Sequence, residues 1–363
     1  VPEPSLSFAG ALTEAFESGV FENVWHCDIR SLYPSIILAE NWIPKRDNLK
    51  IFTFFLEKLR EFRLLAKDAE KSAKSAEQKE YLYSLQSTFK ILINSFYGYL
   101  GFSQGTFNDY TMAENVTGSG RSILSSMVKF LKDGKARVIE IDTDGIYFQP
   151  PEGVKEPDAM KDRIQKILPR GIEVELDSVH PSMFCYKSKN YAVLSKDGEI
   201  SITGAALKSR GLEPFQREYM KKTIKYLLKG DFDSIERMTA ECRTAIEARK
   251  WPIAKFAKSE TLQESLESYK KGISEEGGKR SAAYELAIKS GRDYRAGDQI
   301  SFYVTGTKKN VSVVDNSCLL KDAPEKRDEN MAYYLAKLDE LYKKFSPFIK
   351  NKPAQEQELG LGL

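Results

Sequence analysis

Apolar residues are grouped in several stretches of the chain that predict β-strands. Residues 21–28 form an apolar-leaning run that ends at Asp28. Residues 137–149 predict two strands around a tight turn, Asp142-Thr143-Asp144-Gly145, since Asp and Gly are favoured in turns. Further strand-like pieces occupy residues 172–210. Asp28 and the acidic turn are therefore expected at the ends of strands.

Between these strands, apolar residues recur with the period of an α-helix. Residues 50–69 and residues 81–97 each predict a helix, separated by a polar, lysine-rich segment over residues 71–80. Two helices joined by a short polar tip predict an antiparallel hairpin. The predicted apolar stripe of the first helix consists of Phe55, Leu59, Phe62 and Ala66.

Helices also dominate the rest of the chain. Residues 112–132 predict a third helix, interrupted near Gly118 and Gly120. After Pro214 the sequence becomes mostly helical and rich in lysine, so a domain boundary is predicted near residue 213.

The two ends of the chain are weakly patterned. Residues 1–20 contain Pro2, Pro4, Gly10 and Gly19 and predict a linker or a remnant of a missing N-terminal region. Residues 350–363 predict a disordered tail. The first residue is Val1 and not methionine, which favours a piece cut from a longer protein.

Composition is that of an ordinary soluble globular protein. The 363 residues allow two or three domains, and a net charge of +3 from 55 basic and 52 acidic residues means that any basic surface must be local. No apolar run approaches the length of a membrane span. Four widely spaced cysteines without a CxxC pair argue against a structural zinc site, an iron–sulfur site or a disulfide framework, and favour a reducing, intracellular setting.

The Asp142-Thr143-Asp144-Gly145 turn is the first candidate for chemistry. Crowded carboxylates repel one another, so such a site needs cations, and Mg²⁺ takes hard oxygen ligands with only one or two protein carboxylates. The alternative is a plain surface β-turn. The apolar flanks, residues 138–141 and 146–148, favour function, because they would bury the hairpin in a sheet where an acidic tip is costly.

Cationic side chains on the two-helix hairpin are the second candidate. Lys90, Asn94 and Tyr97 lie at i, i+4 and i+7 and share a helix face, and Arg63 and Lys67 share a face of the other helix. Antiparallel packing can aim the three cations at one point, which suits a polyphosphate. The alternative is a pair of solvated basic faces. With the aspartates, however, the set supplies what phosphoryl transfer to a nucleotide requires.

The order of these motifs resembles the polymerase core of family B DNA polymerases, especially archaeal-type ones. DxxSLYPSI begins at Asp28, KxxxNSxYG begins at Lys90 and DTDG begins at Asp142. Further similar segments, over roughly residues 20–348, are RxxxK from Arg63, KxY from Lys189, RGLE from Arg210, residues 294–304 and residues 333–345.

The resemblance implies an α+β, right-hand polymerase fold. It would have an antiparallel palm sheet, a fingers hairpin of two helices and a mostly helical thumb. The implied boundaries are 21–47 and 99–213 for the palm, 48–98 for the fingers and 214–349 for the thumb.

The resemblance also implies the roles of individual residues. Asp28 and Asp144 would hold two Mg²⁺ ions, for which Mn²⁺ can substitute, with the Ile29 carbonyl in the metal shell and Asp142 as a less direct catalytic carboxylate. Tyr33 would lie under the sugar of the incoming nucleotide and exclude a 2′-hydroxyl, and Glu175 matches a further acidic position near the metals. The implied nucleotide-binding residues are Ser31, Leu32, Tyr33, Arg63, Lys67, Lys90 and Asn94.

Primer–template DNA and deoxynucleoside triphosphates are the implied partners. A separate exonuclease or accessory subunit is a further implied partner, and no contact with a membrane is expected. The implied setting is the cytoplasm, at the nucleoid, or the nucleus or a virus, depending on the source. The implied DNA-binding residues are Tyr97, Thr143, Lys189, Tyr191, Arg210 and Gly211.

The sequence departs from the family pattern in several places. The loop before the fingers is short, residues 41–49, and no exonuclease motif precedes Asp28, so no proofreading is expected from this chain. Insertions occur near residues 204–208 and 273–280, the latter predicted as a flexible loop or a surface turn. Thumb contacts to DNA phosphates carry no sequence information, and their candidates are Lys255, Lys258, Lys270, Lys271, Lys279 and Arg280.

Two other functions fit part of the pattern. Nucleotide cyclases also use palm-type sheets with paired aspartates, but that hypothesis does not account for KxxxNSxYG, KxY or the thumb. An inactive, polymerase-like scaffold that only binds DNA is the second alternative, and the intact aspartates and cations count against it.

Overall fold

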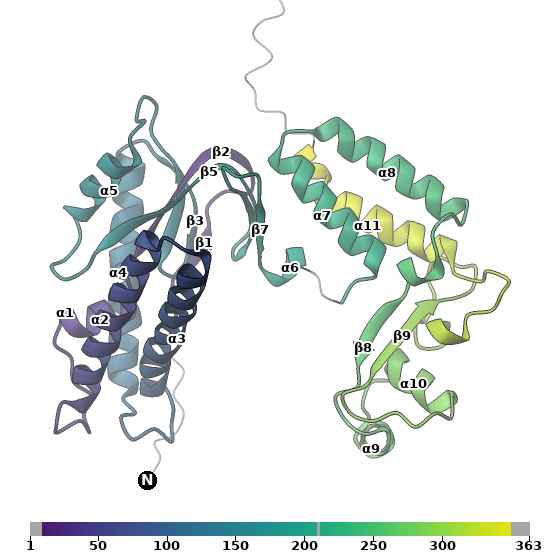
Figure 1. The fold of residues 1–363 in the computed structure, drawn as a ribbon. Helices are drawn as coiled ribbons and strands as arrows, with labels where there is room; N and C mark the ends of the chain where they lie inside the picture. The colour runs from purple at the N-terminus through teal and green to yellow at the C-terminus, as the bar shows by residue number, and fades with distance from the viewer. Residues whose placement is uncertain (1–8, 209–210, 350–363) are drawn as a thin grey trace, which may run out of the picture. The chain divides into compact units, whose positions relative to one another are not determined.

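The computed structural model describes residues 9–208 and 211–349, in two compact units (Figure 1). The first unit contains residues up to 189 together with 194–199, and the second contains 190–193 and the residues from 200 onward. The division therefore lies between residues 190 and 200, whereas the sequence pattern placed the change near 213. Residue 210 and the tail predicted over 350–363 lie outside the described residues.

The first unit combines an antiparallel sheet with helices. Its strands follow the order β1-β3-β4-β2-β5. The strands are β1 (Thr13–Ala15), β2 (Gly19–Ile29), β3 (Arg137–Asp142), β4 (Gly145–Gln149) and β5 (Val174–Lys187). The helices are α1 (Leu32–Ala39), α2 (Ile51–Ser72), α3 (Ala76–Leu100), α4 (Tyr110–Asp133) and α5 (Pro157–Gln165).

The second unit is mostly helical, with a small sheet in the order β10-β9-β8. Its helices are α6 (Ala205–Lys208), α7 (Pro214–Leu228), α8 (Phe232–Glu247), α9 (Leu266–Glu276), α10 (Ala282–Lys289), α11 (Met331–Ile349) and the short 3₁₀ turns η1 (Ile253–Lys255) and η2 (Leu320–Asp322). Its strands are β6 (Asn190–Leu194) without its last residue, β7 (Ile200–Thr203), β8 (Lys258–Thr261), β9 (Gln299–Val304) and β10 (Ser317–Leu319). No helix within the described ranges has the length and apolar character needed to cross a membrane.

Strand β2 explains why the sheet has a polar face. Side chains alternate along a strand, and Trp25, Cys27 and Ile29 are buried in a core with α4 and α5. His26 and Asp28 consequently point to the opposite face. This alternation leaves one side of the sheet free to carry charged groups.

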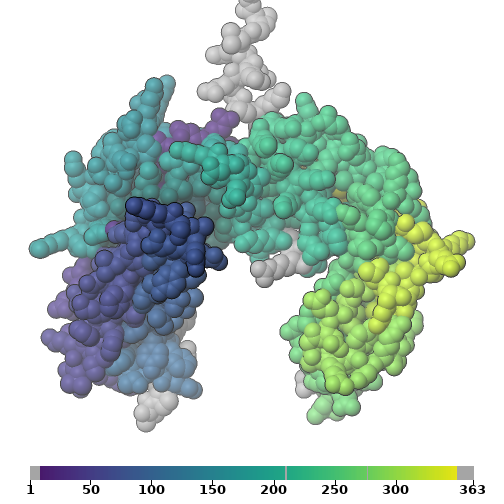
Figure 2. Space-filling model, viewed as in Figure 1, coloured from purple at the N-terminus to yellow at the C-terminus, as the bar shows by residue number. Residues whose placement is uncertain are grey.

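The α2–α3 hairpin packs against α1 and α4 in one lobe of the first unit (Figure 2, purple to blue). Asp47 caps α2 by accepting hydrogen bonds from the backbone N–H groups of Ile51 and Phe52, at 2.9 and 2.8 Å. Ser75 caps α3 through the N–H of Gln78. Because of this cap, most of residues 71–80 are helical, and the polar tip that the sequence predicted shrinks to residues 73–75.

The predicted apolar stripe of α2 is only partly right. Phe52, Leu56 and Ala66 are buried, while Phe55 and Phe62 are about half exposed. Phe52 and Leu56 belong to a small core that α2 shares with α1, α3 and α4. The helix therefore presents a face rotated from the stripe that we had expected.

Three other expectations differ from the structure. Helix α4 is continuous through Gly118 and Gly120 and is not interrupted there. Part of the predicted linker over residues 1–20 is strand β1, which pairs with β3. The segment over residues 273–280 begins inside α9, which ends at a left-handed Gly277 with φ 65°.

Candidate active site

Sheet register places three carboxylates in one row across the polar face. Asp28 on β2 pairs with Gly145 on β4 and with Glu175 on β5, and Gly145 pairs with Asp142 on β3. Side chains of directly paired residues share a face of the sheet. Gly145 is required in this row, because a Cβ there would lie 2.3 Å from Nε2 of His26.

Asp144 joins this row from the turn between β3 and β4. Its backbone oxygen accepts a hydrogen bond from the Ile29 N–H at 2.9 Å, which ties the turn to the end of β2. Asp28 and Asp144 line one pocket of the first unit. The two carboxylates come from distant parts of the sequence and are neighbours in this pocket.

Three cations from the α2–α3 hairpin line the same pocket. Arg63 and Lys67 come from α2 and Lys90 comes from α3. Arg63 donates a hydrogen bond to the hydroxyl of Ser31, and Lys67 forms an ion pair with Glu175. The pocket therefore has an acidic floor, formed by Asp28 and Asp144, and a basic wall, formed by Arg63, Lys67 and Lys90.

Most residues proposed from the sequence for metal and nucleotide binding lie in this pocket. It also contains Arg30, Pro34 and Leu64, which the sequence analysis did not single out. The residues from the sequence analysis that line it are Asp28, Ile29, Ser31, Leu32, Tyr33, Arg63, Lys67, Lys90, Asn94, Tyr97, Thr143, Asp144 and Glu175.

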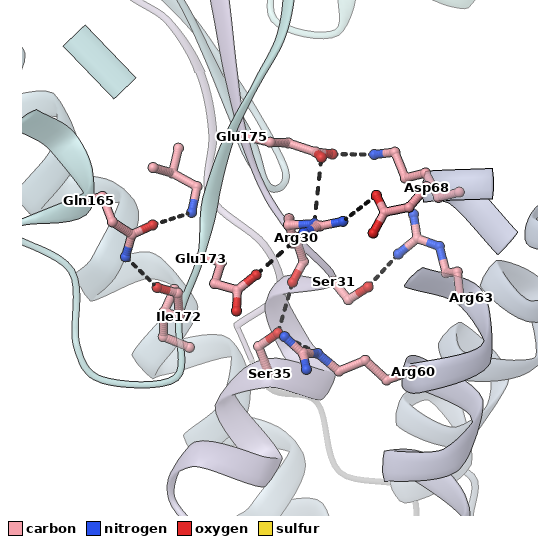
Figure 3. Close-up of polar contacts among 12 residues, drawn as sticks. Arg30, Ser31, Ser35, Arg60, Arg63, Asp68, Gln165, Ile172, Glu173 and Glu175 are labelled. Carbon is pink, nitrogen blue, oxygen red and sulfur yellow. Dashed lines mark hydrogen bonds and ion pairs between the residues drawn. The ribbon is translucent and has the colours of Figure 1, made fainter. Parts of the chain in front are cut away.

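Arg30 links the pocket to its surroundings (Figure 3). Its guanidinium lies 3.2 Å from Asp68 on α2, 3.5 Å from Glu173 and 3.6 Å from Glu175. The Arg30 carbonyl accepts a hydrogen bond from Ser35 at 2.8 Å. Arg30 thus connects α2, β5 and the start of α1. Its place as the cation inside the DxxSLYPSI motif is the sequence feature from which this role could have been predicted.

Burial changes the acid strength of both pocket aspartates. Desolvation, followed by the nearby Asp144, raises the pKa of Asp28 from 3.8 to about 7. Desolvation also raises the pKa of Asp144, although Lys90 and His26 oppose that effect. Oδ1 of Asp28 is buried and has no hydrogen-bond partner among the described residues.

This shift makes a prediction about stability at different pH values. Because the pKa of Asp28 is higher in the folded chain than in the unfolded chain, the folded state holds more protons between about pH 4 and pH 7. The contribution of Asp28 to stability therefore falls as the pH rises through this window. In a buffer with a chelator, the melting temperature of the wild type relative to that of Asp28→Asn is expected to decrease from pH 4 to pH 7. Parallel curves for the two proteins would contradict the shift.

Two aromatic rings close one side of the pocket. The rings of Tyr33 and Tyr97 lie 4.6 Å apart. Gly120 of α4 lies behind Tyr33, since a Cβ on it would be only 3.1 Å from Cε1 of that ring. Helix α4 therefore sets how far the Tyr33 ring can retreat from the pocket.

Three further predicted DNA-binding residues, Lys189, Tyr191 and Gly211, do not line the pocket. Lys189 lies in the first unit, and its ammonium donates a hydrogen bond to Thr143 at 3.2 Å and is 4.0 Å from Asp142. Tyr191 and Gly211 belong to the second unit, where Tyr191 is buried. Arg210 lies outside the described residues.

The predicted thumb cations also belong to the second unit, and several are in ion pairs. Lys255 pairs with Glu218, and Lys258 lies 2.6 Å from Glu260. Arg280 lies 2.9 Å from Asp315. These pairs compete with any phosphate for the same side chains.

Comparison with known proteins identifies the family. The model of DNA polymerase family B matches residues 42–344. The chain belongs to this family. A DNA polymerase 1 of Pyrococcus abyssi (strain GE5 / Orsay) is 30% identical over 65% of this chain and 34% of its own length, and a DNA polymerase of Thermococcus gorgonarius is 28% identical over 73% and 38%.

A solved family B structure has the same fold. The DNA polymerase from the hyperthermophilic archaeon Pyrobaculum calidifontis superposes with a TM-score of 0.68 and 20% identity, over 100% of this chain and 49% of that one. This family B chain spans about a third of the curated relatives that it matches and about half of the solved structure. The resemblance inferred from the sequence motifs is confirmed.

Proposed function

We propose that this chain catalyses template-directed DNA synthesis. The observation that carries the proposal is that Asp28, Asp144 and the cations Arg63, Lys67 and Lys90 line one pocket in a member of DNA polymerase family B. In this reaction the primer 3′-hydroxyl attacks the α-phosphate of a deoxynucleoside triphosphate, and pyrophosphate leaves. Little covalent chemistry falls to the protein, whose task is positioning and charge stabilisation.

The acidic floor fits divalent cations. Oδ1 of Asp28 has no hydrogen-bond partner among the described residues, and burial raises the pKa of both aspartates although Lys90 and His26 oppose that effect at Asp144, so the nearby cations do not fully compensate the two carboxylates. Among the described residues no three His, Cys, Asp or Glu side chains form a metal cluster, but Mg²⁺ usually takes only one or two carboxylates and completes its shell with phosphates. We infer that Asp28, Asp144 and the Ile29 carbonyl hold two Mg²⁺ ions, or Mn²⁺ in their place. When bound, these ions would activate the attacking oxygen and neutralise charge on the leaving one.

The basic wall would hold the triphosphate. Arg63, Lys67 and Lys90 converge on the pocket together with Ser31, Leu32 and Asn94, and Arg63 and Lys67 already engage the oxygens of Ser31 and Glu175. A triphosphate would exchange with these oxygens. Asn94 would line the nucleotide.

We propose that the chain is divided into palm, fingers and thumb. In our proposal the antiparallel sheet with α4 and α5 is the palm, the α2–α3 hairpin is the fingers and most of the second unit is the thumb. Primer–template DNA would contact Tyr97, Thr143 and Lys189 near the pocket. An exonuclease or accessory subunit on another chain remains a proposed partner, and a mismatched primer end is expected to persist with this chain alone.

A primer-extension assay tests the proposal. The chain is incubated with a labelled primer on a longer template, four deoxynucleotides and Mg²⁺, and extension that stops at the template end is expected. Binding of the duplex without extension would favour the inactive scaffold. A cyclic nucleotide product would favour a cyclase.

Sugar selectivity provides a more specific prediction. Replacing Tyr33 by alanine is expected to improve use of ribonucleotides relative to deoxynucleotides by roughly 10- to 200-fold, the discrimination that a binding pocket achieves for a difference of one small group. The ratio of kcat/KM for the two sugars measures this. An unchanged ratio would remove Tyr33 from the proposed role.

Gly120 offers a second test of the same ring. A methyl group on Gly120 would push Tyr33 toward the nucleotide, so Gly120→Ala is expected to raise KM for deoxynucleotides. Gly118→Ala is the matched control, because it lies in the same helix and its Cβ would meet only Arg121 at 3.6 Å. Both changes improve helix propensity alike. Equal effects of the two replacements would show that the helix and not the ring is responsible.

A further inference from the structure

Glu140 is a buried carboxylate that the proposed reaction does not use. It lies on β3, two residues before Asp142, and is fully buried. Burying a carboxyl group is costly unless its oxygens are hydrogen-bonded. An apolar side chain of similar size would fill the same space without this cost, so the contacts of Glu140 need an explanation.

Both oxygens of Glu140 are engaged by the end of β5 and the turn that follows it. Oε1 accepts a hydrogen bond from the backbone N–H of Lys189 at 2.6 Å, and Oε2 accepts one from the thiol of Cys185 at 3.3 Å. Lys189 has φ 57°, a left-handed conformation that is unfavourable for a residue with a Cβ. Such a conformation persists where neighbouring contacts fix it, and Glu140 supplies one of them.

The side chain of this same lysine reaches the acidic turn. Its ammonium donates to the Thr143 hydroxyl at 3.2 Å and lies 4.0 Å from Asp142. Thr143 also has a left-handed backbone, with φ 66°. Glu140 therefore fixes the backbone of Lys189, and the side chain of Lys189 contacts the turn that carries Asp144.

We propose that Glu140 is a positioning residue. It fixes Lys189 against the Asp142–Asp144 turn and thereby strengthens the contact of Lys189 with the primer end. The inference rests on the proposed function, since it assumes that Lys189 contacts DNA. The inference concerns the positioning of Lys189 for this contact, and Glu140 itself would touch neither DNA nor nucleotide.

The test compares Glu140→Met and Glu140→Gln with the wild type. Methionine fills the site but accepts no hydrogen bond from Lys189, whereas glutamine keeps a carbonyl acceptor. The Kd of primer–template, measured by fluorescence anisotropy without nucleotide, is expected to rise roughly 2- to 10-fold in Glu140→Met, the worth of one net hydrogen bond. Glu140→Gln is expected to stay close to the wild type, and the melting temperature of Glu140→Met is expected to be retained.

A double-mutant cycle distinguishes positioning from a general structural effect. If Glu140 acts through Lys189, then Glu140→Met adds nothing to Kd in a Lys189→Ala background. Cys185→Ala serves as the matched control, since it removes the other hydrogen bond of the same carboxyl and leaves Lys189 in place. Its Kd is expected to match that of the wild type.

Three results would overturn the inference: an unchanged Kd in Glu140→Met, an effect of equal size in the Lys189→Ala background, or the same weakening in Cys185→Ala. These leave the proposed function intact, because the wild type still binds and extends primers. Failure of the wild type to bind primer–template would refute both.

Discussion

Replacing Asp144 by asparagine is expected to reduce primer extension by about 10³-fold or more, because several kcal/mol of charge stabilisation by bound metal would be lost. Asp144 shares its pocket with Asp28, and burial raises the pKa of both carboxyl groups. Asparagine keeps the shape of the side chain but offers no charge to a cation. Single-turnover extension with saturating Mg²⁺ measures the loss.

Asp142→Asn is the matched control for this replacement. Asp142 lies in the same turn but does not line the pocket, and it is 4.0 Å from the ammonium of Lys189. We expect its loss to be no more than about tenfold, the cost of one weakened charged contact. Duplex binding and melting temperature should be retained in both variants. Equal losses from the two positions, or a loss of folding in Asp144→Asn, would contradict the assigned roles.

Replacing Lys90 by alanine is expected to give the second large effect. Lys90 faces the pocket from α3 and is the strongest positive influence on Asp144. Losing one charged hydrogen bond to the triphosphate costs about 1.5–3 kcal/mol, so kcat/KM for deoxynucleotides should fall by roughly 10- to 150-fold. The Kd for primer–template should stay unchanged, because the loss concerns the triphosphate.

Lys79→Ala provides the control for Lys90. Lys79 lies on the same helix and is exposed like Lys90, but it does not line the pocket. Its replacement is expected to leave kcat/KM within about twofold, as is usual for surface positions. A similar loss at both positions would indicate a general effect of helix charge. A loss confined to duplex binding would remove Lys90 from the nucleotide site.

The sequence predicted which side chains gather in the pocket better than it predicted their surroundings. Asp28, Asp144 and the three hairpin cations stand in short motifs whose spacing fixes which side chains share a helix face or a strand end, and the structure brings them together. Arg30 was missed, and Glu175 was named only through a resemblance. Their place depends on the pairing of β2 with β5, a register between segments nearly 150 residues apart in numbering that no local pattern contains.

The errors in the fold have related causes. Glycine weakens an isolated helix, so Gly118 and Gly120 predicted a break, but α4 is held by tertiary packing and Gly120 is needed for the close approach of Tyr33. Phe55 fits a helical stripe, yet α2 buries Phe52 and Leu56 against neighbouring helices. Strand β1 is too short to produce a pattern and exists only because β3 offers it an edge.

A crystal structure of this chain with primer–template, an incoming nucleotide and Mn²⁺ would test the central claim most directly. Anomalous scattering locates Mn²⁺ independently of the protein coordinates. The account predicts anomalous peaks in contact with the carboxylates of both Asp28 and Asp144. Peaks that involve neither aspartate, in a complex with an ordered nucleotide, would contradict it.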